Sequence, residues 1–183
     1  MLTGLKSKSD LLFISQELNL PDGGTAQTLE VNLPLNTLER QVFVVTDIMV
    51  YYPNNYVGGS GVVANNTGDF SWSVSSTDLD SVLGSAQTGD ISNPRVLAAG
   101  GGKVNIGATG EVVFREWGSA MASTGTPSDY LGIIATPDFY IRAQNNDVLG
   151  SANTNLQVRV VGYMAIASAD TYAALVTQEV NSQ

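Results

Sequence analysis

Residues 130–167 read YLGIIATPDFYIRAQNNDVLGSANTNLQVRVVGYMAIA, and this stretch decides the fold class. Successive side chains of a β-strand point to opposite faces, so alternation of apolar and polar residues indicates a strand with one buried face. A connection rich in Asn, Gly, Ser and Asp separates two such arms, which is typical of an antiparallel β-hairpin with a long loop. The first arm alternates Phe139, Ile141 and Ala143 with Tyr140, Arg142 and Gln144. In the second arm one parity holds Leu156, Val158, Val160, Met164 and Ile166, and the other holds Gln157, Arg159 and Tyr163.

Alternation of the same kind extends upstream. Segments 25–35, 69–76 and 111–117 are predicted to be strands, and in 69–76 an aromatic core face opposes an outer face of serines. Segment 41–52, QVFVVTDIMVYY, is apolar on both faces and is predicted to be a central strand covered on two sides. Its predicted faces are Val42, Val44, Ile48 and Val50 on one side and Phe43, Val45, Met49 and Tyr51 on the other. The glycine run at 100–103 is predicted to be a hairpin tip.

The two ends of the chain differ from its middle. Within residues 1–24, Ser9 or Asp10 could begin a short helix, and an extended arm against a neighbouring subunit is the alternative. In the tail 168–183, Ser168 or Asp170 can cap a second short helix. We therefore predict an all-β chain with a two-sheet sandwich over 25–167. A single jelly roll of about eight strands is the favoured form of that sandwich.

Composition restricts the possible functions. Hydrophobic residues make up 43 % of the 183 residues and charged residues only 14 %, and the chain contains no cysteine and no histidine. Catalysis by Ser–His–Asp or Cys–His and a conventional zinc site are thereby excluded. We expect no enzyme, no catalytic residue and no cofactor. The first residues also lack the long apolar run of a signal peptide.

The charge balance bears on the partners. The formal net charge is −9, and only three lysines occur. Such a chain offers no basic patch for phosphates, so we expect no direct contact with nucleic acid. No segment approaches the roughly 18 apolar residues of a membrane span, so we expect none.

Several residues are candidates for a site. Asp78, Asp80 and Asp90 could form a calcium loop, although the EF-hand pattern fails and a solvated turn is the alternative. Trp117, beside Arg115, and Tyr56 are candidates for a ligand surface, whereas the alternation around Trp72 predicts a core residue. The carboxylates that could in principle serve glycoside hydrolysis are Glu111, Glu116, Asp138 and Asp47, and nothing in the sequence pairs any two of them.

The run FYIRAQ at 139–144, followed by a loop and by LQVRVVGYMAIA at 156–167, resembles the final hairpin of small single jelly-roll virion proteins from viruses of bacteria or archaea. The low lysine count and the abundance of Ala, Gly, Ser, Thr and Asn are similar too. No functional residue carries over from this resemblance. The chain departs from coat proteins that package naked nucleic acid because it lacks their strongly basic amino-terminal arm.

The resemblance implies a capsid or decoration subunit, located in the virion after assembly in the host cytoplasm. Its partners would be further copies of itself, as a trimer or pentamer, and other virion proteins. The expected contacts are residues 1–20, the loops at 53–68 and 118–129, and the tail 168–183. The alternative function is a carbohydrate-binding or adhesive β-sandwich module.

Overall fold

The computed structural model describes residues 4–20, 25–51, 67–80, 88–89, 92–108, 112–119, 130–147 and 154–180. In this part of the chain, strands form nearly all of the regular structure, with one short 3-10 helix and one α-helix. In chain order the elements are β1 (Leu5–Ser7), β2 (Leu12–Leu20), β3 (Gln27–Asn32), η1 (Thr37–Glu39), β4 (Gln41–Tyr51), β5 (Thr67–Ser75), β6 (Val96–Ile106), β7 (Val112–Ser119), β8 (Gly132–Ile134), β9 (Asp138–Asp147), β10 (Thr154–Ala167) and α1 (Ala169–Val180).

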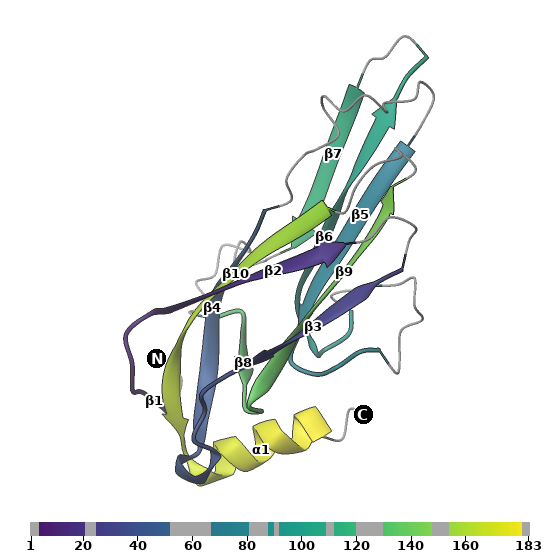
Figure 1. Cartoon of the computed structure of the whole chain (residues 1–183). Coiled ribbons are helices and arrows are strands. Elements are labelled where there is room, and N and C mark those ends of the chain that lie inside the picture. The colour runs from purple at the N-terminus through teal and green to yellow at the C-terminus, as the bar shows by residue number, and fades with distance from the viewer. Residues whose placement is uncertain are drawn as a thin grey trace.

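The strands form two antiparallel sheets that pack as a sandwich (Figure 1). Sheet A has the order β1-β10-β4-β8, and β2 continues the edge that β1 begins by pairing with the same side of β10. Sheet B has the order β3-β9-β5-β6-β7. From β2 to β5 and again from β8 to β10, successive strands alternate between the two sheets, which is the strand order of a jelly roll. The predicted fold class is therefore confirmed.

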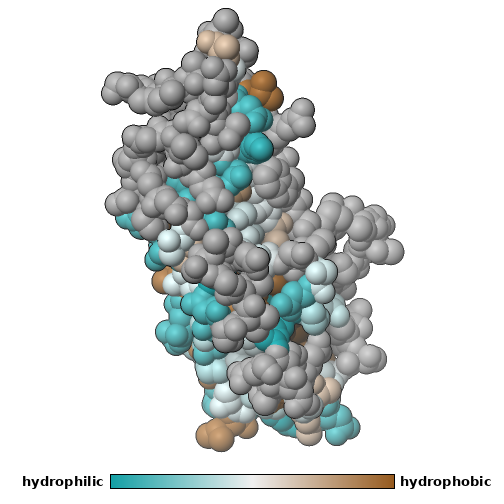
Figure 2. Space-filling view, turned by 90° about the vertical axis from the view of Figure 1, so that its right-hand side faces the viewer, coloured by the Kyte–Doolittle hydropathy of each residue, from teal (hydrophilic) through white to brown (hydrophobic). Residues whose placement is uncertain are grey.

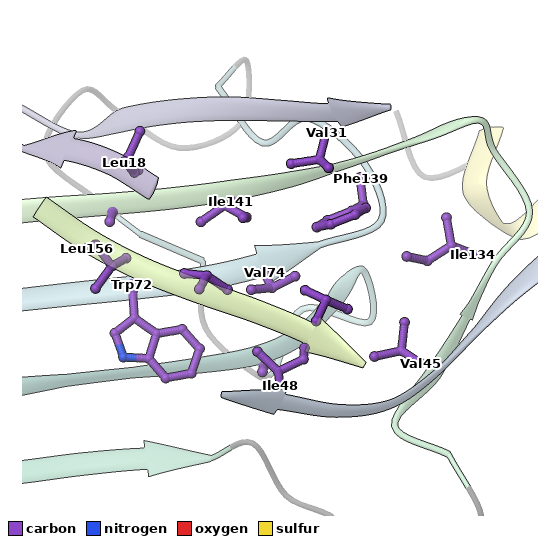
Figure 3. Packing of buried hydrophobic residues seen from close by; sticks show 14 of the residues in the cluster. Leu18, Val31, Val45, Ile48, Trp72, Val74, Ile134, Phe139, Ile141 and Leu156 are labelled. Carbon is purple, nitrogen blue, oxygen red and sulfur yellow. The ribbon is translucent and has the colours of Figure 1, made fainter. Parts of the chain in front are cut away.

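The core lies between the two sheets, and its side chains come from the inward faces of both (Figure 3). Sheet A contributes Leu18, Val45, Ile48 and Leu156, while sheet B contributes Val31, Trp72, Val74, Phe139 and Ile141. Trp72 is buried in this cluster, as its alternation with Phe70 and Val74 predicts. Figure 1 also shows that β5, β6 and β7 extend past β10 and β4 at the end opposite α1.

The predicted hairpin of residues 130–167 is wrong, although both of its strands exist. β9 pairs with β3 and β5 in sheet B, whereas β10 pairs with β1, β2 and β4 in sheet A. Two alternating strands joined by a polar connection give the same sequence pattern whether they pair side by side or face each other across a core. Here they face each other, and both apolar faces meet in the sandwich interior.

The predicted amino-terminal helix is also wrong. β2 is a nine-residue strand that pairs with β10 along its whole length, from Leu12 opposite Gly162 to Leu20 opposite Thr154. Its even-numbered residues Leu12, Ile14, Leu18 and Leu20 face the core. The segment is extended, as the alternative prediction had it, but it pairs within its own chain. β10 offers a long edge for pairing, so pairing with it satisfies the backbone hydrogen bonds of β2. The same pairing buries the apolar face of β2 against the core.

The glycine run is not a hairpin tip. β6 continues through it, and Gly100, Gly101 and Gly102 pair with Trp72, Ser71 and Phe70 of β5. Glycine is unfavourable inside a strand by itself. Next to Trp72 and Phe70, however, a residue without a side chain leaves lateral room for large rings on the neighbouring strand.

Candidate functional site

Among the described residues, α1 covers only one half of the outer face of sheet A. Near the base of the sandwich α1 packs on it through Tyr172, Leu175 and Val176, against Val42, Val44, Ala165 and Ala167 of β4 and β10. α1 begins at Ala169, and Oγ of Ser168, one of the two predicted caps, accepts a hydrogen bond from the backbone N–H of Thr171 at 3.3 Å. The prediction that segment 41–52 is covered on two sides is therefore confirmed for the first half of β4.

A β-bulge at Thr46 decides which residues of β4 face outward farther along. Val161 of β10 pairs with Asp47, and the next residue, Gly162, pairs with Val45. Thr46 is thus the extra residue, and its Oγ1 donates a hydrogen bond to the carbonyl oxygen of Val161 at 3.1 Å. A bulge of one residue reverses the alternation beyond it.

The two faces predicted for β4 are therefore wrong beyond Thr46. Ile48 and Val50 belong to the core side together with Phe43 and Val45. Met49 and Tyr51 point outward, and 52 % and 62 % of their surface is exposed. Asp47, a candidate site residue, accepts a hydrogen bond from the backbone N–H of Ile48 at 2.8 Å, which gives it a local structural role.

Three strands form the half of the outer face that α1 does not reach, which we term the distal face. Its outward residues lie in rows across β2, β10 and β4, and the pairing register defines each row. The rows are Glu17–Gln157–Tyr51, Ser15–Arg159–Met49 and Phe13–Val161–Asp47. The face therefore combines exposed apolar side chains with one central arginine.

The first two rows of the distal face enclose a groove of about 440 Å³. Residues 15–17, 49–51 and 157–159 line it. Its lining includes no residue of sheet B, so the groove opens outward rather than into the core. Two hydrogen bonds orient its polar side chains: Nε of Arg159 donates to Oγ of Ser15 at 3.1 Å, and Nδ2 of Asn155 donates to Oε1 of Glu17.

β2 is an edge strand. Among the strands that the structure describes, it pairs only with β10. Its sequence LFISQELNL has a single charged residue, Glu17, and no proline. Phe13 exposes 64 % of its surface, and Leu11, directly before the strand, is also exposed. By contrast, Figure 2 shows a side of the molecule whose coloured residues are mostly hydrophilic or intermediate, with hydrophobic residues only in small separate spots.

On the other layer, a buried arginine ties a loop to sheet B. Arg142 of β9 has only 3 % of its surface exposed and pairs with the half-exposed carboxylate of Asp80. Oγ1 of Thr28 donates to Asp80 at 2.7 Å and accepts from Nη1 of Arg142 at 2.9 Å. Burial lowers the pKa of Arg142, and the charge of Asp78 opposes that shift.

The serines of β5 lie on the face opposite its aromatic core face, as predicted, but this face is covered rather than exposed to solvent. Ser73 and Ser75 are buried, and so is Leu79 of the loop that follows. Oγ of Ser75 donates to the carbonyl oxygen of Thr77 at 2.8 Å, and Oγ of Ser73 accepts from the N–H of Gly89 at 3.1 Å. The loop and Arg142 therefore cover this part of sheet B.

The calcium candidates have other roles in the described residues. Asp80 is engaged by Arg142 and Thr28, while Asp78 accepts a hydrogen bond from the backbone N–H of Asp80 at 2.9 Å, as in a turn. Asp90 lies outside the described residues. Across the described part of the chain, no three acidic side chains come together as a metal site.

The remaining candidates are the ligand-surface residues and the carboxylates, and the structure describes only some of them. Trp117 and Arg115 lie on β7, opposite Gly101 and Lys103 of β6, and their side chains are outside the described residues. Tyr56 and Glu111 are outside them as well. Glu116 lies on β7 in sheet B and Asp47 on β4 in sheet A. Asp138 is at the start of β9 and lies near Tyr140.

The groove residues were not singled out from the sequence as a site. The alternation pattern marks Tyr51 only as a member of one face of segment 41–52 and Arg159 only by its parity. Alternation could have assigned each of them to an outer face, but their meeting depends on strand pairing. No protein-family model matches the chain, and a search of curated proteins finds no significant match. Of the helices in the described residues, none is long and apolar enough to cross a membrane.

Proposed function

We propose that this chain is a structural subunit of a virion, in a capsid or decoration layer, and that it assembles with copies of itself through the β2 edge of sheet A. The observation that carries the proposal is the unprotected character of this edge. β2 is long, nearly uncharged and free of proline, pairs only with β10 among the described strands, and exposes Phe13 on the outer face of sheet A.

Soluble β-proteins usually protect such edges with charged residues, proline or short strands, because unpaired backbone groups invite pairing with another chain. An added strand would satisfy these backbone groups. The neighbouring apolar side chains of Leu11 and Phe13 could be buried at little desolvation cost, since no charge on them must be stripped of water. The contact would then repeat from copy to copy.

The jelly-roll strand order and the sparse charge of the chain support the same function, but a fold alone does not specify one. The edge strand supplies the additional argument, because it gives the subunit a surface through which to assemble. β2 also lies within residues 1–20, the segment for which a subunit contact was expected.

The test is the mass of the purified protein by light scattering across concentration, salt and pH, with negative-stain electron microscopy of the same samples. We expect rings, sheets or shells from the unmodified chain. Phe13→Lys should raise the concentration needed for assembly at least tenfold, because it places a charge on the edge strand. Met49→Lys is the matched control, since it adds the same charge on the same face but on β4, which lies on the other side of β10 from β2, and it should assemble normally.

A chain that stays monomeric at high concentration in every condition would refute the structural function. If both variants impair assembly equally, the structural function would stand, but β2 would be excluded as the subunit contact.

A specific observation favours a second candidate function, that of a carbohydrate-binding or adhesive module. The groove on the distal face places an exposed tyrosine beside a few polar side chains, as small-ligand sites do.

A further inference from the structure

We propose that the groove on the distal face of sheet A binds a neutral saccharide, with Tyr51 as the stacking platform and Gln157, Glu17 and Arg159 as partners for the sugar hydroxyls. This binding would be an activity separate from assembly and does not depend on it. The volume of the groove, about 440 Å³, is within the range of roughly 300–1,000 Å³ that is common for small-ligand sites.

The apolar part of the groove suits one face of a sugar ring. A pyranose has a face formed by C–H groups and a rim of hydroxyls. Tyr51 exposes 62 % of its surface at the end of β4, and Met49 lies two residues before it on the same face with 52 % exposed. A rigid aromatic side chain with two rotatable bonds offers this contact area at small entropic cost.

The polar part lies where the hydroxyl rim would be. Gln157 is the direct cross-strand neighbour of Tyr51, and Glu17 is the direct neighbour of Gln157 on the other side. Directly opposed residues of antiparallel strands have their Cβ atoms about 4.5–5.5 Å apart. An amide, a carboxylate and the ring therefore lie in one row across the groove, over two strand spacings or about 10 Å, which suits a short saccharide.

These polar groups are held in place before any ligand binds. All three strands are paired, and Arg159 and Glu17 are oriented by Ser15 and Asn155. Residues on paired strands with supporting hydrogen bonds hold a binding geometry better than loop residues do. The guanidinium donates and the carboxylate accepts, so together they can bind adjacent hydroxyls of one ring.

The charges of the groove favour a neutral ligand. Glu17 and Arg159 offset each other, and the chain as a whole carries −9. An anionic sugar would gain no net attraction from the pair and would be repelled by the protein. A purely apolar partner is disfavoured as well, because it would bury the charge of Arg159 without a hydrogen-bonding group of its own.

The test uses the full-length chain with saturation-transfer NMR against lactose, cellobiose and maltose, and with a glycan array that carries neutral and sialylated glycans. We expect transfer to the ring protons of at least one neutral sugar and array binding to neutral glycans. Tyr51→Ala should weaken binding at least tenfold, and Gln157→Ala should weaken it as well. Leu38→Ala is the control, because it removes an exposed apolar side chain on η1, outside both the groove and the β2 edge, and it should bind like the unmodified chain.

Because Tyr51 and Gln157 are exposed, both variants should fold normally, which a thermal melt of each would verify. The proposal is overturned if no neutral sugar binds in either assay, if only sialylated glycans bind, or if Tyr51→Ala and Leu38→Ala behave alike. Assembly of the subunit is measured by other variants, so either idea can fail alone.

Discussion

Gly162 of β10 lies so close to Phe43 of β4 that a Cβ on the glycine would be 2.7 Å from Cζ of the phenylalanine ring. The same Cβ would be 2.3 Å from the carbonyl oxygen of Val44. Gly162 follows the residue opposite the bulge, where β2, β10 and β4 run side by side. The ring of Phe43, which is fully buried in the core, therefore occupies space that any other residue at position 162 would need.

Gly162→Ala should destabilise the sandwich by about 1–3 kcal/mol, the usual range for overpacking a core, because the backbone of Val44 cannot move aside easily. Urea unfolding followed by tryptophan fluorescence measures the change. Gly132→Ala on β8 is the matched control: its Cβ would meet the side chain of Leu97, which is partly exposed and can turn away. An equal loss in both variants would contradict the special role of position 162.

The pair formed by Arg142 and Asp80 should be measurably coupled. Asp80→Asn should lower the free energy of unfolding by about 1–2 kcal/mol, since Arg142 would stay buried with less countercharge while the exposure of Asp80 limits the effect. A double-mutant cycle with Arg142→Met should give a coupling energy of at least about 0.5 kcal/mol. Strictly additive effects of the two substitutions would show that the contact contributes nothing.

Alkaline pH should weaken the fold through Tyr140. Burial raises the pKa of Tyr140 in the folded state, and the charges of Asp138, Glu30 and Asp78 raise it further. A raised folded-state pKa means that the contribution is fully present below the unfolded value, near 10, and is lost as the pH rises through the folded value. Tyr140→Phe should therefore reduce the loss of stability above pH 10.

Tyr51→Phe is the control for this pH effect, because Tyr51 is largely exposed. The measurement is urea unfolding at a series of pH values from neutral upward. Identical alkaline slopes in Tyr140→Phe and the unmodified chain would contradict the prediction.

The cap of α1 should stabilise the helix that covers half of sheet A. Ser168→Ala should cost about 0.5–2 kcal/mol, because Thr171 would lose the acceptor for its backbone N–H. Ser168→Asp should retain most of the stability, since aspartate also accepts this hydrogen bond. Thermal melts followed by circular dichroism would compare the three chains, and a loss in Ser168→Asp as large as in Ser168→Ala would exclude the capping role.

Local sequence patterns predicted the type of most elements. The alternation of Phe70, Trp72 and Val74 is that of β5, and the inward face it predicts is buried. The capping serine and the apolar residues of the tail likewise predicted α1. These features depend on residues a few positions apart, and the backbone periodicity converts such spacing directly into a face.

The same patterns failed where a choice of partner was involved. The alternation of residues 139–144 and 156–160 fits both strands, yet it could not say whether β9 and β10 pair in one sheet or face each other across the core. In residues 11–20, an apolar pattern that could fit a helix became a strand because β10 offered a free edge. At Thr46 one extra residue reversed the faces of β4, and only the pairing with Val161 reveals it.

The candidate sites show the same division. The sequence alone predicted an all-β sandwich from the spacing of apolar residues. Its composition showed an acidic chain with few lysines and with no cysteine or histidine. Both kinds of information depend only on the order and type of residues along the chain. The tertiary structure alone decided that Glu17, Gln157 and Tyr51 form one row and that Asp80 is engaged by Arg142. The physical reason is that alternation determines which face a side chain is on, whereas the neighbour across a strand is selected by the burial and hydrogen bonding of the whole sandwich.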